Sequence, residues 1–307
     1  MAIGDVKPVT AGDCTDLYYV DTGMYDTAGY GSAYVLDAER PAVVETGVGT
    51  HADRILAALD DLSIDRADLE VIAVTHVHLD HAGGAGYLAE ACPNAEVVVH
   101  EIGAPHLVDP ERIVQGTKSA VGDLWAFYAE PVSIPEERLT PVSDGDRVDL
   151  GDHALEVHHA PGHAPHQVVF RDPANDAVFT GDAAGIYVPS RDRVRATTPP
   201  WSFDLERALA GVETIRSLDP DVLLFSHFGP HDDPETALAA AEEALREWVD
   251  AVEAKREELG DDSTTVEHFV ETTGMGDVWG DAMAGPVAAV DARGALHYLR
   301  EREETEE

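Results

Sequence analysis

Basic residues are scarce in this chain. Among its 307 residues, 20 are lysine or arginine and 60 are aspartate or glutamate, so the formal net charge is −40 at pH 7. Nucleic-acid binding needs clustered basic side chains that neutralise phosphates, so we expect no nucleic-acid partner. Strongly acidic surfaces suit high salt, where the Debye length falls to about 3 Å at 1 M. The composition therefore predicts a halophilic protein, and a functional acidic surface for a basic partner is the alternative.

Cysteines and long apolar runs are also scarce. Cys14 and Cys92 are the only cysteines, which is too few for a disulfide framework or a cysteine-based metal site. No apolar run approaches the roughly 18 residues of a membrane span. The start of the chain, MAIGDVKPVT, lacks the basic and apolar regions of a secretory signal. We expect a cytoplasmic protein without a membrane partner.

Short apolar runs alternate with helical patterns through most of the chain. Strands are predicted at residues 16–20, 32–36, 42–45, 71–75, 96–99, 147–150, 154–158, 167–170, 177–180 and 222–225. Helices are predicted at residues 50–62, 83–90, 204–217 and 235–259. Residues 103–139 are expected to be irregular and helical, either packed on the domain or closing over the site as a lid.

This order of elements fits two mixed sheets with helices outside both faces. The predicted fold class is α+β, a four-layer αββα sandwich. From residue 233 onward the pattern is helical, with an apolar stripe along residues 235–259. We therefore predict an αββα domain at 1–232 and a helical C-terminal extension at 233–307. The stripe can pack on its own domain or on a second subunit, which would make the protein a homodimer.

The stretch THVHLDH at residues 75–81 places four ligand-type side chains directly after an apolar run. Histidine nitrogens bind zinc at about 2.0–2.1 Å, and two histidines one residue apart at a strand end can turn toward one ion. His76 and His78 have this spacing. Asp80 and His81 follow and can serve a second ion or position its water. The alternative, that these are polar surface residues, does not explain why they cluster behind a buried strand.

Three more predicted strands are followed directly by ligand-type residues. His163 stands in HAPGH, Asp182 ends TGD, and His227 stands in SHFG. Strands whose ends meet at one edge of a sheet sandwich can bring such residues together. We expect them to converge with the histidines of THVHLDH on a single site.

In this order, the motifs THVHLDH, HAPGH, TGD and SHFG resemble the metallo-β-lactamase superfamily, specifically its HxHxDH hydrolase branch. The resemblance covers about residues 15–232 and implies the αββα fold. It also implies that one metal ion is bound by His76, His78 and His163, the other by Asp80, His81 and His227, with Asp182 bridging the two. The implied cofactor is zinc, two ions per chain, although iron or manganese would accept the same ligands.

Two metal ions can hold a bridging hydroxide at neutral pH, because coordination lowers the pKa of water from 15.7 toward about 7. Asp80 is expected to orient this hydroxide and to carry a proton to the leaving group. The prediction is an enzyme that hydrolyses a thioester or other ester of a small molecule, as the glyoxalase II-like and lactonase-like members that the chain resembles do. The alternatives are a mononuclear iron persulfide dioxygenase, a nuclease or phosphodiesterase, and a non-catalytic metal-binding protein.

Three further residues are candidates for supporting roles. Glu45 in VVETG stands where many relatives have an aspartate that orients a metal-bound histidine, and we expect it to do the same. The alternative is a solvated acid at a strand end. Tyr187 and His106 are candidates for the substrate pocket, with packing or surface roles as the alternative.

Overall fold

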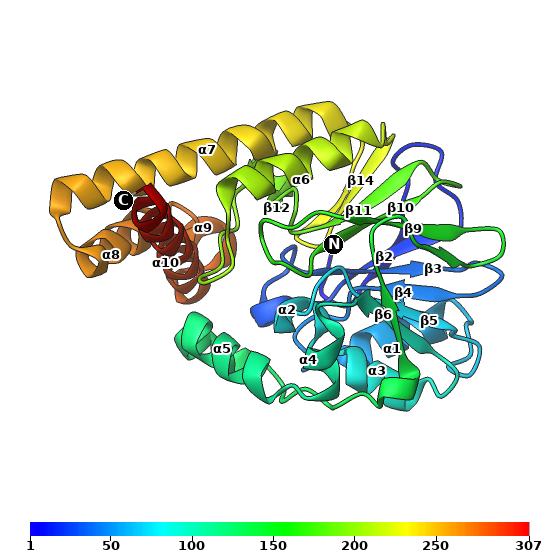
Figure 1. Cartoon of the computed structure of the whole chain (residues 1–307). Coiled ribbons are helices and arrows are strands. Elements are labelled where there is room, and N and C mark those ends of the chain that lie inside the picture. Colours follow the sequence, from blue (N-terminus) through cyan, green and yellow to red (C-terminus); the bar gives the residue numbers. More distant parts are fainter. Residues whose placement is uncertain (307) are drawn as a thin grey trace.

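Two mixed β-sheets form the centre of the protein in the computed structural model, which describes residues 1–306 (Figure 1). The first sheet has the strand order β1-β2-β3-β4-β5-β6-β7, and the second has the order β15-β14-β11-β10-β9-β8. The strands of the first sheet are β1 (Val6–Pro8), β2 (Leu17–Asp21), β3 (Ser32–Leu36), β4 (Ala42–Val44), β5 (Val71–Ala73), β6 (Glu96–His100) and β7 (Leu139–Val142). Those of the second are β8 (Arg147–Asp149), β9 (Ala154–His159), β10 (Val168–Asp172), β11 (Ala177–Gly181), β14 (Val222–Phe225) and β15 (Gly229–His231).

Strand β3 is almost continuously apolar because both of its faces are covered. Tyr34 and Leu36 belong to the hydrophobic cluster between the two sheets, whereas Ala33 and Val35 belong to the cluster under the helices that cover the first sheet. Successive side chains of a strand point to opposite faces, so a strand covered on both faces buries every position. The sandwich thus has one hydrophobic layer between the sheets and one outside each of them.

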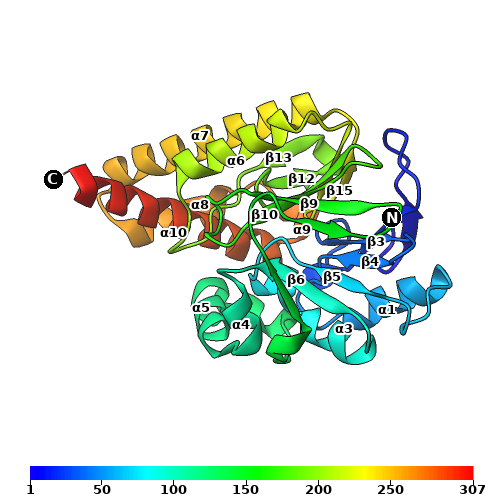
Figure 2. The same ribbon diagram turned by 45° about the vertical axis from the view of Figure 1, so that its right-hand side comes forward.

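Helices cover both outer faces of the sandwich (Figures 1 and 2). The elements that follow the early strands are α1 (Ala52–Asp61), α2 (Leu79–Ala82), α3 (Ala85–Ala91), α4 (Ala104–Val108) and α5 (Glu111–Val121). Those that follow the late strands are α6 (Leu205–Ser217), α7 (Pro234–Leu259), α8 (Asp262–Thr272), α9 (Gly276–Trp279) and α10 (Asp281–Glu306). Side chains of α1 and α3 pack on the first sheet, and side chains of α6 and α7 pack on the second. The predicted α+β fold with four αββα layers and a helical C-terminal region is confirmed.

Residues 103–139 are mainly helical, as predicted. Helices α4 and α5 are followed by two short 3-10 helices, Gly122–Phe127 and Glu136–Arg138. The strands that the sequence pattern did not predict are β1, β7, β15 and the separate pair β12 (Ile186–Val188) and β13 (Arg193–Arg195). All but one of these strands have three residues, too few for an alternating pattern to be visible.

The apolar stripe of α7 packs on its own chain. Leu238, Leu245 and Val249 lie in the same hydrophobic cluster as side chains of α6, β14 and α10. The prediction of a boundary at residues 232 and 233 stays a prediction, and residue 307 at the end of the extension lies outside the described residues. Within residues 1–306, no helix is both long and apolar enough to cross a membrane.

Candidate metal centre

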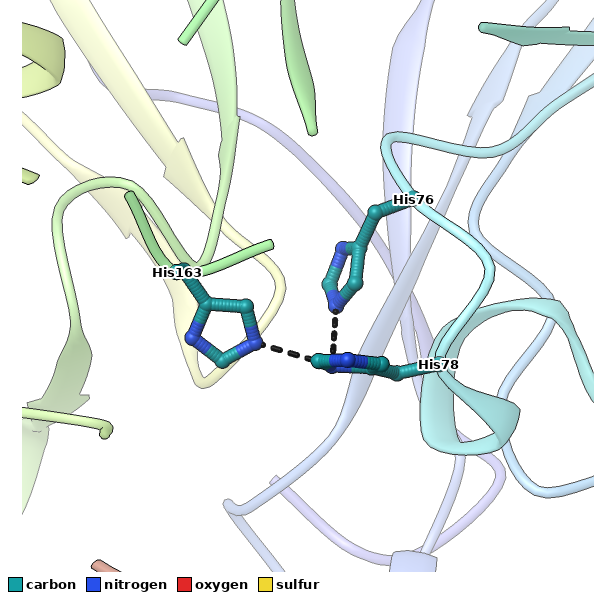
Figure 3. Close-up of side chains that lie close together, drawn as sticks. All are labelled: His76, His78 and His163. Carbon is teal, nitrogen blue, oxygen red and sulfur yellow. Dashed lines mark hydrogen bonds between the residues drawn. The ribbon is translucent and has the colours of Figure 1, made fainter. Parts of the chain in front are cut away.

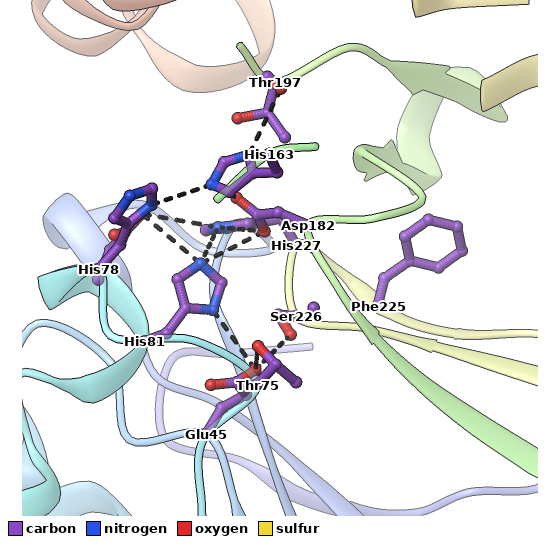
Figure 4. A network of polar contacts seen from close by, with 12 residues as sticks. Glu45, Thr75, His78, His81, His163, Asp182, Thr197, Phe225, Ser226 and His227 are labelled. Atoms are coloured by element: carbon purple, nitrogen blue, oxygen red, sulfur yellow. Dashed lines mark hydrogen bonds and ion pairs between the residues drawn. The ribbon is translucent and has the colours of Figure 1, made fainter. Parts of the chain in front are cut away.

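The predicted ligand residues come together at one edge of the two sheets (Figure 4). His76 and His78 follow β5, and Asp80 and His81 lie in α2. The second sheet supplies the others from the segments after its strands: His163 after β9, Asp182 directly after β11, and His227 after β14. The site therefore spans the interface between the sheets, and each sheet contributes donors.

Gly181 allows the two sheets to approach closely at this edge. It ends β11 with a φ of +51°, and a Cβ atom there would lie 2.6 Å from Thr75 Oγ1. Any other residue would push the strand end away from the THVHLDH loop, and the φ value would add strain. The glycine of the TGD motif thus brings Asp182 next to the histidines.

His76, His78 and His163 form the first group of donors (Figure 3). His78 Nδ1 lies 3.1 Å from His76 Nε2 and 3.0 Å from His163 Nε2. Ligands at 2.0–2.1 Å from a tetrahedral zinc ion lie about 3.3 Å from one another, so the spacing fits one ion. Burial and neighbouring imidazoles lower the pKa of His78 to about 3 and that of His76 well below its usual value. Both rings are neutral at pH 7 and carry a lone pair that a metal ion can use.

Asp80, His81 and His227 form the second group of donors. His81 Nε2 lies 3.3 Å from His227 Nε2, and Asp80 Oδ2 lies 3.8 Å from each of these nitrogens. Both imidazoles are buried, whereas the Asp80 side chain is 25% exposed. Two nitrogens and one oxygen at these distances suit a second ion of the same kind.

Asp182 lies between the two groups, and each of its oxygens faces one of them. Oδ2 lies 3.2 Å from His163 Nε2, and Oδ1 lies 3.3 Å from His81 Nε2 and 3.5 Å from His227 Nε2. Asp182 Oδ1 is buried without a hydrogen-bond partner in the part of the chain that the structure describes. Leaving such a buried oxygen unsatisfied is costly, and a cation between the donors would remove that cost. The donor set and this orphaned oxygen fit a pair of divalent metal ions.

The electrostatics of the cluster lead to the same conclusion. Burial lowers the pKa of His81, but Asp182, Glu45 and Asp80 outweigh it and hold that pKa well above its usual value. Burial also raises the pKa of Asp182, yet the imidazoles around it, that of His81 above all, hold that pKa well below the ordinary range. Without a metal ion, a proton on His81 supplies the positive charge that these carboxylates favour, and a cation bound between the donors would take its place.

Glu45 lies behind His81, on the side away from Asp182 (Figure 4). Its side chain is buried, and Oε1 lies 3.5 Å from His81 Nδ1. The same oxygen accepts hydrogen bonds from Thr75 Oγ1 at 2.5 Å and from Ser226 Oγ at 3.0 Å. These contacts hold the carboxylate where it favours a proton on His81 Nδ1, which leaves Nε2 free to bind a metal ion.

Comparison with known proteins identifies the family. The family model described as "Metallo-beta-lactamase superfamily" matches residues 26–227, about two thirds of the chain. The chain belongs to the metallo-beta-lactamase superfamily. Its members are mostly metal-dependent hydrolases, and the chain is accordingly an enzyme of that class.

Several relatives are similar over large parts of the chain. The metallo-beta-lactamase fold-containing protein ST1585 of Sulfurisphaera tokodaii is 27% identical over 222 residues, 70% of this chain and 79% of the relative. The crystal structure of the archaeal superfamily protein ST1585 from Sulfolobus tokodaii aligns with a TM-score of 0.64 and 25% identity, covering 77% of this chain and 87% of that one. Glyoxylase B2 of Dictyostelium discoideum is 30% identical, over 54% of this chain and 52% of the relative. The acyl-coenzyme A thioesterase MBLAC2 of Homo sapiens is 25% identical, over 54% of this chain and 62% of the relative.

A cavity of about 350 Å³ opens onto the donor cluster of this superfamily member. His78, Asp80, His163, Asp182 and His227 contribute to its lining, so the open side of the donor cluster faces the cavity. This volume is within the range of about 300–1,000 Å³ that is typical of small-molecule sites.

The two residues predicted for the substrate pocket lie in different places. His106 is among the residues that line the cavity, and its role in binding a substrate stays a prediction. Tyr187 packs outside the lining: its ring centroid lies 5.6 Å from that of Phe225 and 4.7 Å from that of His231, and its hydroxyl donates to Asp192 Oδ1 at 3.1 Å. Strand β12 turns this side chain toward β15, a direction that the position after TGD did not indicate.

Three tyrosines that sequence reasoning missed line the cavity beside the donors. Tyr25 and Tyr128 are buried, and their hydroxyl oxygens lie 2.5 Å apart. The ring of Tyr30 lies 4.9 Å from that of His227. They come from the segment between β2 and β3 and from the segment after α5, so no motif joins them in the sequence.

Proposed function

We propose that this chain is a dinuclear metal-dependent hydrolase that cleaves a thioester or other ester of a small molecule with water. The observation that carries the proposal is the position of Asp182, whose two oxygens face two separate groups of three donors. A bridging carboxylate of this kind suits two cations about 3.5–4 Å apart. A mononuclear centre would leave one group of donors, and one buried oxygen, without a partner.

The metal ions would be held by the residues of the two groups, and Asp182 would contact both. When bound, two divalent ions supply a water nucleophile at neutral pH and an electron-withdrawing contact for the substrate oxygen. Zinc is the expected metal because the donors are mostly imidazole nitrogens, and iron or manganese would accept the same set.

Asp80 is the residue that we propose for proton transfer. It lines the cavity and is partly exposed, so its carboxylate can reach both the attacking water and the leaving group. It would take the proton that the water loses and return it to the departing thiolate or alkoxide. His76 and His81 lack this access because they are buried and do not line the cavity.

Tyr25 and Tyr128 are suited to stabilising the substrate oxygen. In their hydroxyl pair, one proton is used between the two oxygens, so the other can be donated into the cavity. Because both hydroxyl groups are buried, a hydrogen bond to an oxygen that gains negative charge would be stronger than in water. Burial raises the pKa of both tyrosines well above its usual value, so each keeps its proton at neutral pH.

The names of two relatives support a thioester or ester as the bond that is hydrolysed. Glyoxylase B2 and the acyl-coenzyme A thioesterase MBLAC2 are similar to about half of this chain, and the second name denotes thioester hydrolysis. The acidic composition supports a salt-adapted cytoplasmic protein without a nucleic-acid or membrane partner. We also propose a homodimer, which a measurement of the molar mass in solution would test.

The test combines metal content with turnover in one preparation. The protein is purified in high salt without added metal, its metals are measured by elemental mass spectrometry, and thioesters, lactones and phosphodiesters are assayed. We expect about two zinc ions per chain, with thioester or lactone hydrolysis that chelation abolishes and zinc restores. A single iron with oxygen consumption on a persulfide would establish the dioxygenase alternative. Turnover of phosphodiesters alone would identify a nuclease, and two metals with no turnover at all would favour a binding protein.

A further inference from the structure

The part of the cavity that helices α5 and α10 line is mainly apolar. Helices α5 and α10 form its two sides, and Figures 1 and 2 show α5 facing α10 across this region. The apolar lining residues of these two helices and of the turn after α5 are Ile113, Ala120, Val121, Leu124, Val287 and Val290. Leu124 and Val287 are buried in one hydrophobic cluster where the turn after α5 contacts α10, so the two sides of the cavity meet at this end.

Two of the polar residues in this region, Asp291 and Arg112, have other partners or lie near the solvent. Asp291 on α10 accepts a hydrogen bond from the Thr198 backbone N–H at 2.9 Å, and its backbone oxygen accepts one from Thr198 Oγ1 at 2.7 Å. Arg112 is exposed, and Trp201, which also lines the cavity, is 56% exposed. These two residues mark the side that opens to solvent. The closed end is suited to an apolar group of a ligand.

Gly116 lies in the middle of α5 and lines the apolar part of the cavity. A Cβ atom added there would meet no other atom within 4 Å, and the backbone is not in the left-handed region. This differs from Gly86 in α3, where a Cβ atom would lie 2.1 Å from Val132 O. Glycine inside a helix is less favourable than alanine. Neither local strain nor close packing requires a glycine at position 116. Because Gly116 has no side chain, the space beside it in the cavity is open.

We propose that the cleft between α5 and α10 binds the apolar acyl chain of the substrate, and that Gly116 sets the chain length that the enzyme accepts. The proposal rests on the hydrolase function given above. With the ester carbonyl at the metal centre, the acyl chain would extend past Gly116 toward Leu124 and Val287. Each buried methylene should raise kcat/KM by about fourfold until the closed end is reached.

The test compares Gly116→Ala and Gly116→Leu with the wild type on a series of thioesters. The substrates are acetyl, butyryl, hexanoyl, octanoyl and decanoyl thioesters of one small thiol. The matched control is Ser119→Leu, an exposed position on the same helix outside the cavity lining. We expect Gly116→Leu to lower kcat/KM for the longest accepted chain at least tenfold and that for the acetyl thioester less than threefold. Gly116→Ala should give a smaller change in the same direction, and Ser119→Leu none.

Binding provides a second readout that does not depend on turnover. Decanoate binding to wild type and variants is measured by calorimetry, with thermal unfolding as a check on folding. We expect Gly116→Leu to weaken decanoate binding at least tenfold and Ser119→Leu to leave it unchanged. If decanoate binds in this way but no ester is hydrolysed, the proposed function is wrong and the acyl site stands. If esters are hydrolysed with the same chain-length profile in Gly116→Leu and wild type, the acyl site is refuted and the hydrolase function stands.

Discussion

Replacing Glu45 by glutamine tests how the second group of donors is organised. The substitution keeps the size of the side chain and removes its negative charge from beside His81. In the structure, Glu45 Oε1 lies 3.5 Å from His81 Nδ1 and accepts hydrogen bonds from Thr75 and Ser226. Without the charge, a proton on His81 Nδ1 is less favoured, and the Nε2 lone pair is less available to the metal ion.

The expected effect is large enough to measure directly. Loss of a carboxylate that orients a metal-binding histidine costs about 10- to 100-fold in metal affinity, which is about 1.4–2.7 kcal/mol. Glu45 faces His81 directly and reaches His76 only through the Thr75 hydroxyl, so the affinity of the group that contains His81 should fall by this factor. The affinity of the group formed by His76, His78 and His163 should change less than threefold. Glu45→Asp keeps the charge but moves it away by one methylene, so its effect should be smaller.

The assay is a zinc titration of metal-free protein in high salt against a chromophoric chelator. Glu90→Gln, which removes an exposed acid on α3, is the control for a change in net charge alone. We expect this control to bind both ions as the wild type does. If Glu45→Gln also keeps both affinities within threefold, the carboxylate does not orient His81 and the reasoning is refuted.

Four further predictions follow from particular contacts. Asp182→Asn should lower bound zinc from about two ions per chain to one or fewer by elemental analysis, because one oxygen becomes a neutral amide nitrogen that cannot bind metal. Tyr128→Phe should lower kcat by about tenfold or more with the metal content unchanged, since it removes one hydroxyl of the pair. Leu59→Ala, at a fully buried position on the inner face of α1, should reduce the free energy of unfolding by about 2–5 kcal/mol in denaturant titrations. The hydrogen bond to Asp172 at 2.9 Å raises the pKa of buried His153. The hydrogen bond between His153 and Asp172 should therefore stabilise the protein fully below the pKa of about 6.5 that His153 has in the unfolded chain. This stabilisation should be lost as the pH rises through the higher pKa of His153 in the folded protein. The stability difference between wild type and His153→Gln should shrink accordingly from pH 6 to pH 9, and a difference that grows would contradict this.

The candidate ligands could be found in the sequence because they stand in four motifs, each of which follows a different strand. His76, Asp182 and His227 stand directly after apolar runs, and strand ends in such a sandwich meet at a common edge. Strand pairing and the order of motifs are therefore enough to predict the fold and the convergence of the donors. The division of the donors into two groups, one of them around His81, was implied by the resemblance to the metallo-β-lactamase superfamily.

The shape and lining of the cavity depend on contacts between distant segments. Tyr25 and Tyr128 are 103 positions apart in the sequence, yet their hydroxyl groups are in contact. Gly116 lines the cavity together with residues of α10, which follow it by more than 160 positions. Tyr187, expected in the pocket, is turned away because β12 pairs with β13 and directs its ring toward His231. The sequence by itself determined the fold and contained the motifs that name the candidate donors, since both depend on local strand patterns and motif spacing. The tertiary structure alone decided which side chains face the cavity, because side-chain direction depends on packing between elements far apart in the chain.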